Sequence, residues 1–216
     1  MINELNEKGF IVIRNFFVED VVELSHNYLR FKYNKIQRFE KLRELARTTI
    51  SRNDPGDGYS FYTDDYTESL LLNSQKKLEK FLRVSLFPTY SFCRIYERGN
   101  SLVPHIDRNA CEISVTCPAI LSDNRPSTIF VSNKLYSDSQ ALQNGIEGHG
   151  NFTKVDLLPG DIMIYKGIER LHWRDPLESD YLIQFFMHYV LADGQYTEEK
   201  FNRRPYIGYF EKENVG

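Results

Sequence analysis

The spacing of hydrophobic residues changes character near residue 87. Before that point, apolar residues recur every three or four positions, as in Val21, Leu24 and Tyr28. This period predicts amphipathic helices, because residues three and four apart share one face of a helix. Three segments carry it: residues 19–31, 36–46 and 68–84. We therefore expect residues 1–87 to form a mainly helical support layer, entered through a short β-rich segment, GFIVIRNFF, at residues 9–17.

From Thr89 onward, short β-prone runs alternate with turns. The runs read YSFCRIYE, LVPHID, CEISVTC, TIFVS, FTKVDL, DIMIY, LHWR and YLIQFFMHYV. Many short strands separated by turns are typical of a barrel or a sandwich, here preceded by a helical layer. We therefore expect one α+β domain over residues 1–216, with a β core in residues 88–191 and a tail in residues 192–216.

Two polar stretches interrupt these elements. Residues 52–60 contain Asp-Pro-Gly and Asp-Gly, which favour turns, so we expect a loop there. The stretch up to residue 66 is either plain surface or a lid over a pocket. Residues 133–150 carry SDSQ and NGIEGHG and predict a second exposed loop. The tail contains Arg203, Arg204 and Tyr206, which can close over a substrate or remain solvated.

Composition argues against several classes of function but does not identify one. The formal charge of -3 gives no broad attraction to nucleic acid or to an anionic membrane. No apolar run reaches the length of a membrane span, and the N-terminal residues lack the pattern of a signal peptide. The three cysteines are odd in number and have no CxxC spacing, which argues against a disulfide framework or a structural zinc site. We therefore expect a cytoplasmic protein with reduced core cysteines.

The first candidate for chemistry is the pair His105 and Asp107 in the run RIYERGNSLVPHID. On a strand, residues i and i+2 point to the same face, so the imidazole and the carboxylate converge. Two histidines and one carboxylate with open coordination positions are the ligand set of non-haem Fe(II) oxygenases. For the second histidine we favour His172, which follows a Pro-Gly-Asp turn and a strand, over His149, which lies among glycines.

These motifs together resemble the 2-oxoglutarate/Fe(II)-dependent oxygenases, particularly the prolyl 4-hydroxylase-like branch. The run RIYERGNSLVPHID is similar to that branch's Tyr-x-x-Gly-…-Pro-His-x-Asp signature. The matching positions are Tyr96, Gly99, Pro104, His105 and Asp107. LLPGDIMIYKG followed by His172 resembles the family's Pro-Gly-Asp strand and distal histidine. The resemblance covers most of the chain from Gly9 to Val190.

The resemblance implies a double-stranded β-helix (jelly-roll, cupin-like) core that holds Fe(II) through His105, Asp107 and His172. It further implies 2-oxoglutarate as cosubstrate and O2 as oxidant. The expected reaction is hydroxylation of an unactivated C–H bond in an amino acid, a peptidyl residue or a small metabolite, with succinate and CO2 as co-products. Because Asp107 is present, the halide-binding vacancy of halogenases is not expected.

The sequence departs from the family pattern at the anchor for the distal carboxylate of 2-oxoglutarate. Where the prolyl-hydroxylase branch has a lysine, this chain has Leu182. A forked guanidinium is a suitable replacement. We favour Arg174, which shares a strand face with His172, over Arg94, which shares one with the expected cosubstrate-contacting Tyr96; a substrate-binding role for Arg174 stays open.

Further donors come from CEISVTC, whose polar face carries Ser114 and Thr116. If that face looks into the barrel, either hydroxyl can donate to 2-oxoglutarate. Gln184 shares a face with His188 and can line the same pocket.

Two other functions fit parts of the sequence. A cupin-like metal enzyme that does not use 2-oxoglutarate shares the sandwich and the metal. A metal-free β-sandwich binding module shares only the sandwich and leaves the placement of the two histidines and Asp107 unexplained. The sequence indicates neither the substrate nor the oligomeric state.

Overall fold

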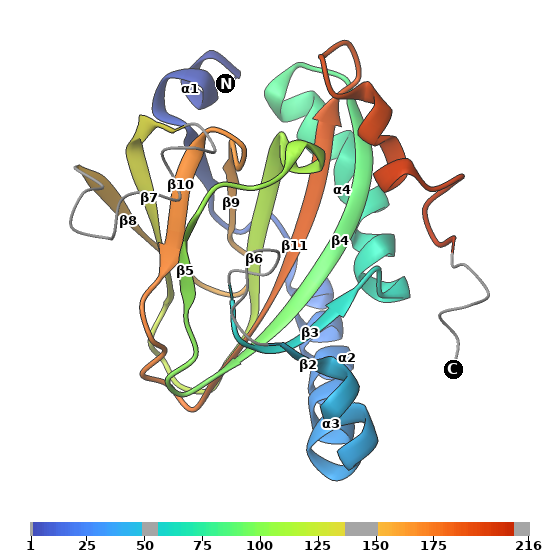
Figure 1. Ribbon diagram of the computed structural model, residues 1–216, viewed down its shortest axis with the longest axis vertical. Coiled ribbons are helices and arrows are strands. Elements are labelled where there is room, and N and C mark those ends of the chain that lie inside the picture. Colours follow the sequence, from blue (N-terminus) through green and yellow to red (C-terminus); the bar gives the residue numbers. More distant parts are fainter. Residues whose placement is uncertain (1, 49–55, 137–150, 210–216) are drawn as a thin grey trace.

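The computed structural model describes residues 2–48, 56–136 and 151–209 (Figure 1). Its helices are α1 (Ile2–Lys8), α2 (Glu19–Arg38), α3 (Glu40–Ala46) and α4 (Asp65–Leu82), with 3-10 segments η1 (Asn109–Cys111) and η3 (Thr197–Arg203). The strands are β1 (Phe10–Ile13), β2 (Arg47–Thr48), β3 (Gly58–Tyr62), β4 (Leu86–Glu97), β5 (Leu102–His105), β6 (Ile113–Leu121), β7 (Ser127–Leu135), β8 (Phe152–Leu157), β9 (Ile162–Tyr165), β10 (Arg170–Arg174) and β11 (Tyr181–Leu191).

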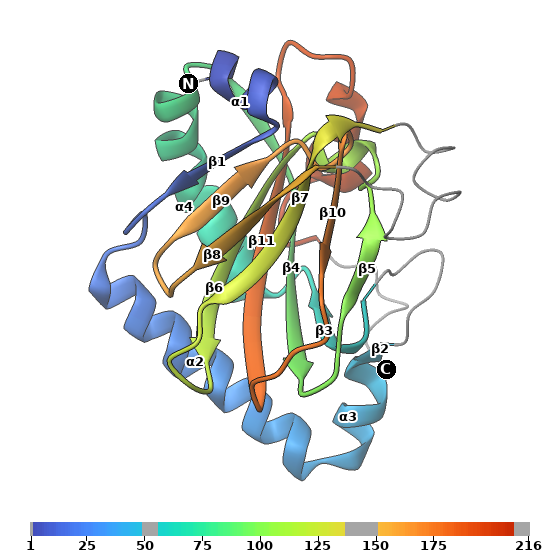
Figure 2. The ribbon, with the colours of Figure 1, turned by 90° about the vertical axis from the view of Figure 1, so that its left-hand side faces the viewer.

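The strands form two antiparallel sheets. The larger has the order β1-β9-β6-β11-β4-β3-β2, and the smaller has the order β5-β10-β7-β8. Figure 2 shows the smaller sheet on one side of the larger sheet and the helices α2 and α4 on its other side. The expected α+β architecture with a jelly-roll core is therefore confirmed. The N-terminal part contributes strands as well as helices, because β1, β2 and β3 all join the larger sheet.

Local capping interactions and backbone conformations define the ends of the two long helices. The side chain of Asp64 accepts hydrogen bonds from the backbone N–H groups of Tyr66 and Thr67, which caps the start of α4. The helix ends at Arg83 in the left-handed conformation (φ +62°). Helix α2 runs unbroken to Arg38, and the extended Phe39 separates it from α3. The two helical segments predicted from the hydrophobic spacing are therefore confirmed, although the break between them, at Phe39, falls later than expected.

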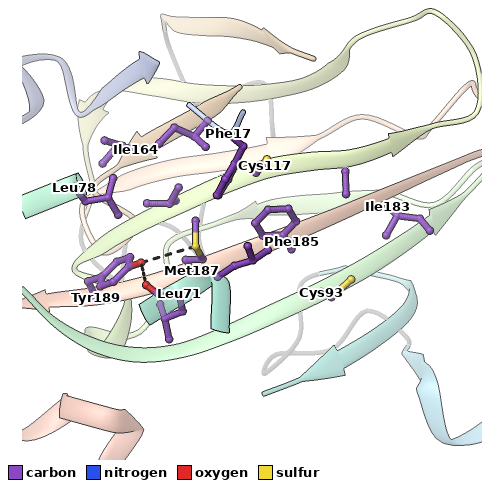
Figure 3. Packing of buried hydrophobic residues seen from close by; sticks show 14 of the residues in the cluster. Phe17, Leu71, Leu78, Cys93, Cys117, Ile164, Ile183, Phe185, Met187 and Tyr189 are labelled. Atoms are coloured by element: carbon purple, nitrogen blue, oxygen red, sulfur yellow. Dashed lines mark hydrogen bonds between the residues drawn. The ribbon is translucent and has the colours of Figure 1, made fainter. Parts of the chain in front are cut away.

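Strand alternation divides the larger sheet into an apolar face and a face that mixes polar and apolar side chains. The outward face carries the apolar members of β4, β6, β9 and β11, which pack against α2 and α4 in one core cluster. Residues of β11 on this face include Phe185, Met187 and Tyr189, and Figure 3 shows them packed among side chains of several elements. Tyr189 also donates a hydrogen bond of 2.7 Å to the carbonyl of Leu71 in α4. Burying each large apolar side chain contributes about 1.5–3 kcal/mol, so this layer fixes the sheet.

The opposite face looks toward the smaller sheet and carries polar groups. Ser114, Thr116, Gln184 and His188 all lie on it, and each is buried. Their positions follow from register, because His188 is the Cα partner of Ser114 across β11 and β6. The polar face of CEISVTC therefore lies inside the barrel, which was one of the two alternatives for that segment.

Both predicted loops are partly wrong. Gly58–Tyr62 forms β3, which pairs with β4, so the end of the expected 52–60 loop is a strand. Residues 133–135 complete β7 rather than beginning a loop. In each case pairing with a neighbouring strand satisfies the backbone groups that the sequence assigns to turns. Of the two segments, residues 52–55 and 137–150 lie outside the described residues, so the lid over a pocket stays a prediction.

The tail packs beside β4 through η3. Arg204 donates a hydrogen bond of 2.6 Å to the buried Glu68 of α4, and Arg203 pairs with Glu199. Tyr206 is exposed. Arg204 therefore ties the tail to α4, whereas the pair of Arg203 with Glu199 lies within η3.

Candidate metal centre

Two neighbouring strands of the smaller sheet bring the predicted histidines together. His172 on β10 is the direct Cα partner of His105 at the end of β5. Figures 1 and 2 both show these strands side by side. Asp107 follows β5, and its backbone N–H donates a 2.8 Å hydrogen bond to the carbonyl of Gly167. His172, which lies 65 positions after Asp107 in the sequence, is thus brought beside His105 and Asp107.

The three side chains converge through one atom each. Oδ1 of Asp107 lies 3.4 Å from Nε2 of His105 and 3.5 Å from Nε2 of His172. The two imidazole ring centres are 4.2 Å apart. Ligand atoms about 2.1 Å from one metal and at right angles around it are about 3 Å apart. This separation fits a single transition-metal ion.

Backbone carbonyls orient both histidines for metal binding. Nδ1 of His105 lies 2.9 Å from the carbonyl of Val103, and Nδ1 of His172 lies 2.9 Å from that of Arg170. A carbonyl only accepts hydrogen bonds, so each Nδ1 carries the proton. In the neutral imidazole each Nε2 therefore carries the lone pair, and it faces Asp107. Histidine ligands of metals are commonly oriented in this way.

The carboxylate of this group is ionised. Burial alone raises the pKa of Asp107, but His172 and His105 outweigh burial and hold that pKa well below its ordinary value. Burial lowers the pKa of His105, and His172 lowers it further. For His172, burial lowers the pKa, but the charge of Asp107 and the hydrogen bonds to Asp107 and to the Arg170 carbonyl together outweigh burial and raise it. A metal cation at this point supplies the positive charge that the buried carboxylate requires.

A second group of possible ligands, Asp107, Cys111 and His188, shares the same carboxylate. It is the weaker candidate. Burial raises the pKa of the Cys111 thiol well above its ordinary value, whereas metals bind the thiolate. Nδ1 of His188 is also engaged, 3.0 Å from Oγ of Ser114. The described residues therefore favour His105, Asp107 and His172.

Beside the histidines, Arg174 lies inside the barrel in a network of buried polar groups. Its Nη2 donates a 2.6 Å hydrogen bond to Oε1 of Gln184, and its Nη1 donates to the carbonyl of Thr128. Oε1 of Gln184 also accepts from Ser127 at 2.9 Å, and Nε2 of Gln184 donates to the hydroxyl oxygen of Thr116. The hydroxyl hydrogen of Thr116 thus stays available for another acceptor.

Two buried polar atoms in this network have no hydrogen-bond partner among the described residues: Nε of Arg174 and the hydroxyl of Tyr96. The guanidinium carbon of Arg174 is 5.2 Å from the centre of the Tyr96 ring. A buried polar group left unsatisfied costs about 1–3 kcal/mol. An anionic ligand that accepts from both groups removes that cost.

Arg94 also lies beside Tyr96. Its guanidinium carbon is 5.8 Å from the Tyr96 ring and 5.1 Å from the Phe92 ring, and Nη1 is 3.4 Å from the carbonyl of Asp57. Arg94 is buried, as is Arg174. The structure therefore places all four residues expected around the cosubstrate, namely Arg174, Arg94, Tyr96 and Thr116, on inward-facing positions.

Solved structures share this arrangement of sheets. The chain is similar to a non-haem α-ketoglutarate-dependent epimerase, SnoN, from nogalamycin biosynthesis (16% identity, TM-score 0.64, 88% of this chain and 79% of that chain). It is also similar to a Pseudomonas putida prolyl-4-hydroxylase (13% identity, TM-score 0.55, 87% and 95%). A third such structure is HygX from Streptomyces hygroscopicus with nickel and 2-oxoglutarate bound (10% identity, TM-score 0.57, 89% and 86%).

The fold is that of the 2-oxoglutarate/Fe(II)-dependent oxygenases. The resemblance inferred from the sequence motifs is therefore confirmed at the level of the fold. No protein-family model matches the chain, and no curated protein matches it significantly. Among the residues that the structure describes, no helix combines the length and the apolar character needed to cross a membrane.

Several sequence expectations can now be placed within this oxygenase fold. Trp173, which strand alternation turns away from His172 and Arg174, is buried and stacks on Phe130 with ring centres 5.4 Å apart. Leu182, which occupies the position of the family's lysine, packs against Tyr96 in an apolar cluster. His26 is exposed on α2. The alternative ligand His149 lies outside the described residues.

Sequence reasoning missed two residues beside the metal-type cluster. His188 appears in a hydrophobic strand and reads as a core polar residue, yet it contacts Ser114 next to Asp107. Gly167 lies so close that an added Cβ would be 2.1 Å from Oδ2 of Asp107. A glycine five residues before His172 is the only sequence signal for this contact, and it gains meaning only once the strands are paired.

Proposed function

We propose that the protein is a 2-oxoglutarate- and O2-dependent non-haem Fe(II) dioxygenase that hydroxylates an amino acid, a peptidyl residue or a small metabolite, with succinate and CO2 as co-products. The observation that carries the proposal is the convergence of His105, Asp107 and His172 through Nε2, Oδ1 and Nε2. This donor set suits non-haem Fe(II) and leaves positions for a chelating cosubstrate and O2.

In this proposal each of the three residues has a defined role. His105 and His172 bind iron through Nε2 because Nδ1 is committed to a backbone carbonyl. Asp107 binds through Oδ1 and offsets part of the metal charge. Bound iron with 2-oxoglutarate supplies an oxidant able to cleave a C–H bond, at the expense of oxidative decarboxylation of the cosubstrate.

The cosubstrate residues are proposed from their chemistry. Arg174 holds the distal carboxylate of 2-oxoglutarate, because its buried guanidinium has an unsatisfied Nε and lies next to the unsatisfied hydroxyl of Tyr96. Gln184 orients Arg174, and Thr116 offers a further donor. Arg94, which also lies beside Tyr96, is the alternative anchor. Burial keeps water from competing for these hydrogen bonds.

Aromatic residues border the side of the centre nearest β4. Phe92 and Phe186 lie with ring centres 6.0 Å apart, and Tyr90 lies 4.5 Å from His188. The exposed Arg108, directly after Asp107, places its guanidinium carbon 4.6 Å from the Tyr90 ring. These side chains are suited to receive a substrate with an apolar body and a polar or anionic group.

The proposal is tested by supplying 2-oxoglutarate labelled at its C1 carboxylate, with Fe(II), O2 and a panel of free amino acids and proline-containing peptides. We expect release of labelled CO2 that requires both Fe(II) and O2 and is lost in His105→Ala. Incorporation of label from ¹⁸O2 into a product identifies hydroxylation as the outcome. Iron-loaded protein that releases no labelled CO2 would instead favour the cupin-like enzyme that does not use 2-oxoglutarate.

A further inference from the structure

Asp107 is constrained on the side away from the histidines. Oδ1 faces both Nε2 atoms, whereas Oδ2 lies 3.1 Å from the hydroxyl of Ser114, which donates to it. Gly167 closes the same side, because a Cβ there would be 2.1 Å from Oδ2 and 2.8 Å from Oγ of Ser114. The two carboxylate oxygens therefore have different surroundings, one turned to the candidate metal position and one held by the protein.

Ser114 is itself held by the larger sheet. It is fully buried on β6, and its Cα partners are His188 on β11 and Tyr165 on β9. Oγ of Ser114 lies 3.0 Å from Nδ1 of His188. Nothing in the proposed chemistry uses His188, although it is buried, polar and one hydrogen bond from the carboxylate.

The number of hydrogens fixes the direction of this chain. A serine hydroxyl has one hydrogen, and an ionised carboxylate only accepts. The hydroxyl has a second possible acceptor in the carbonyl of Cys111 at 3.2 Å, but a bond to a charged oxygen is about twice as strong as a neutral one. Ser114 therefore donates to Asp107, and Nδ1 of His188 donates to Ser114.

We propose that Ser114 and His188 are positioning residues that hold Asp107 as a monodentate ligand through Oδ1. Ser114 occupies Oδ2 and so prevents both oxygens from turning to the metal. His188 fixes the rotamer of Ser114 from the neighbouring strand of the same sheet. This inference rests on the proposed iron site, and it replaces the expectation that Ser114 contacts 2-oxoglutarate.

The chain offers well-matched variants for a test. Ser114→Ala removes the donor to Asp107, and Ser74→Ala is its control, because Ser74 is fully buried on α4 and its hydroxyl has no partner among the described residues. His188→Phe keeps a ring of similar size but loses Nδ1. His188→Asn restores a donor near the position of Nδ1. The affinity for Co(II), used as a spectroscopic substitute for Fe(II), and its ligand-field absorption are measured without 2-oxoglutarate.

We expect Ser114→Ala to bind Co(II) about 10- to 100-fold more weakly, the usual effect of losing a group that orients a metal ligand, and to show a changed ligand-field spectrum. His188→Phe should shift both readouts in the same direction, and His188→Asn should return them toward wild type. A merely structural role lowers the melting temperature and leaves the spectrum unchanged.

The two possible failures are distinguishable. Wild-type protein that binds no Co(II) contradicts the iron site and with it the proposed function. Wild-type protein that binds Co(II), together with Ser114→Ala and His188→Phe variants of equal affinity and identical spectrum, overturns the positioning role alone. If Ser114→Ala does not fold, the comparison of His188→Phe with His188→Asn decides the question.

Discussion

Replacing His172 with alanine is expected to lower the affinity for Fe(II) by more than about 100-fold, which is the upper range for partners that act only through a ligand. His172 is almost fully buried, and its Nε2 faces Asp107 at 3.5 Å. Its removal leaves two of the three proposed donors. Anaerobic equilibrium dialysis with Fe(II) measures the change, and labelled CO2 release should fall to the level without protein.

The control for this variant is His26→Ala. His26 is exposed on α2, so its loss removes an imidazole without touching the cluster. Circular dichroism of both variants establishes that they are folded. A folded His172→Ala protein that binds Fe(II) as tightly as His26→Ala would contradict the assignment of His172 as a ligand.

Arg174→Ala should weaken the binding of 2-oxoglutarate and leave Fe(II) affinity near the wild-type value. A hydrogen bond to a charged group contributes about 1.5–3 kcal/mol, and each 1.4 kcal/mol is a factor of ten in affinity. We therefore expect a loss of about 10- to 100-fold for each hydrogen bond that the guanidinium makes to the carboxylate. Isothermal titration of the Fe(II)-loaded, oxygen-free protein with 2-oxoglutarate measures it.

Two further variants separate the alternatives. Arg174→Lys keeps the charge but loses the planar fork, so we expect affinity between that of alanine and arginine. Arg94→Ala removes the other buried guanidinium beside Tyr96. If 2-oxoglutarate affinity is unchanged in Arg174→Ala and falls in Arg94→Ala, the anchor is Arg94. Arg174 then binds the substrate or stabilises the fold.

Much of the fold was predictable because its signals are local. Helical spacing identified α2 and α4, and short β-prone runs identified most strands of both sheets. The membership of β1, β2 and β3 in the larger sheet was not predictable, because strand pairing depends on contacts between distant segments. The turn-forming residues around Gly58 likewise did not indicate that the residues which follow would pair with β4 as strand β3.

The candidate site divides in the same way. His105 and Asp107 were found because they lie only two residues apart in the sequence, although β5 ends at His105 and Asp107 follows it. His188 was missed because the contact that gives it meaning, with Ser114, joins positions 74 residues apart. The same limit means that strand parity alone did not decide between Arg174, which we favoured, and Arg94, since it places both inside the barrel and only contacts, such as the bond from Arg174 to Gln184, distinguish them.

The central claim is that one site binds Fe(II) and 2-oxoglutarate together. Its most direct test is an anaerobic titration of the wild-type protein with Fe(II) and then 2-oxoglutarate, followed by ultraviolet-visible absorption. Chelation of the metal by the keto acid should give a metal-to-ligand charge-transfer band that saturates at one equivalent and is lost in His172→Ala. Well-folded protein that binds Fe(II) and shows no such band on addition of 2-oxoglutarate would contradict the account.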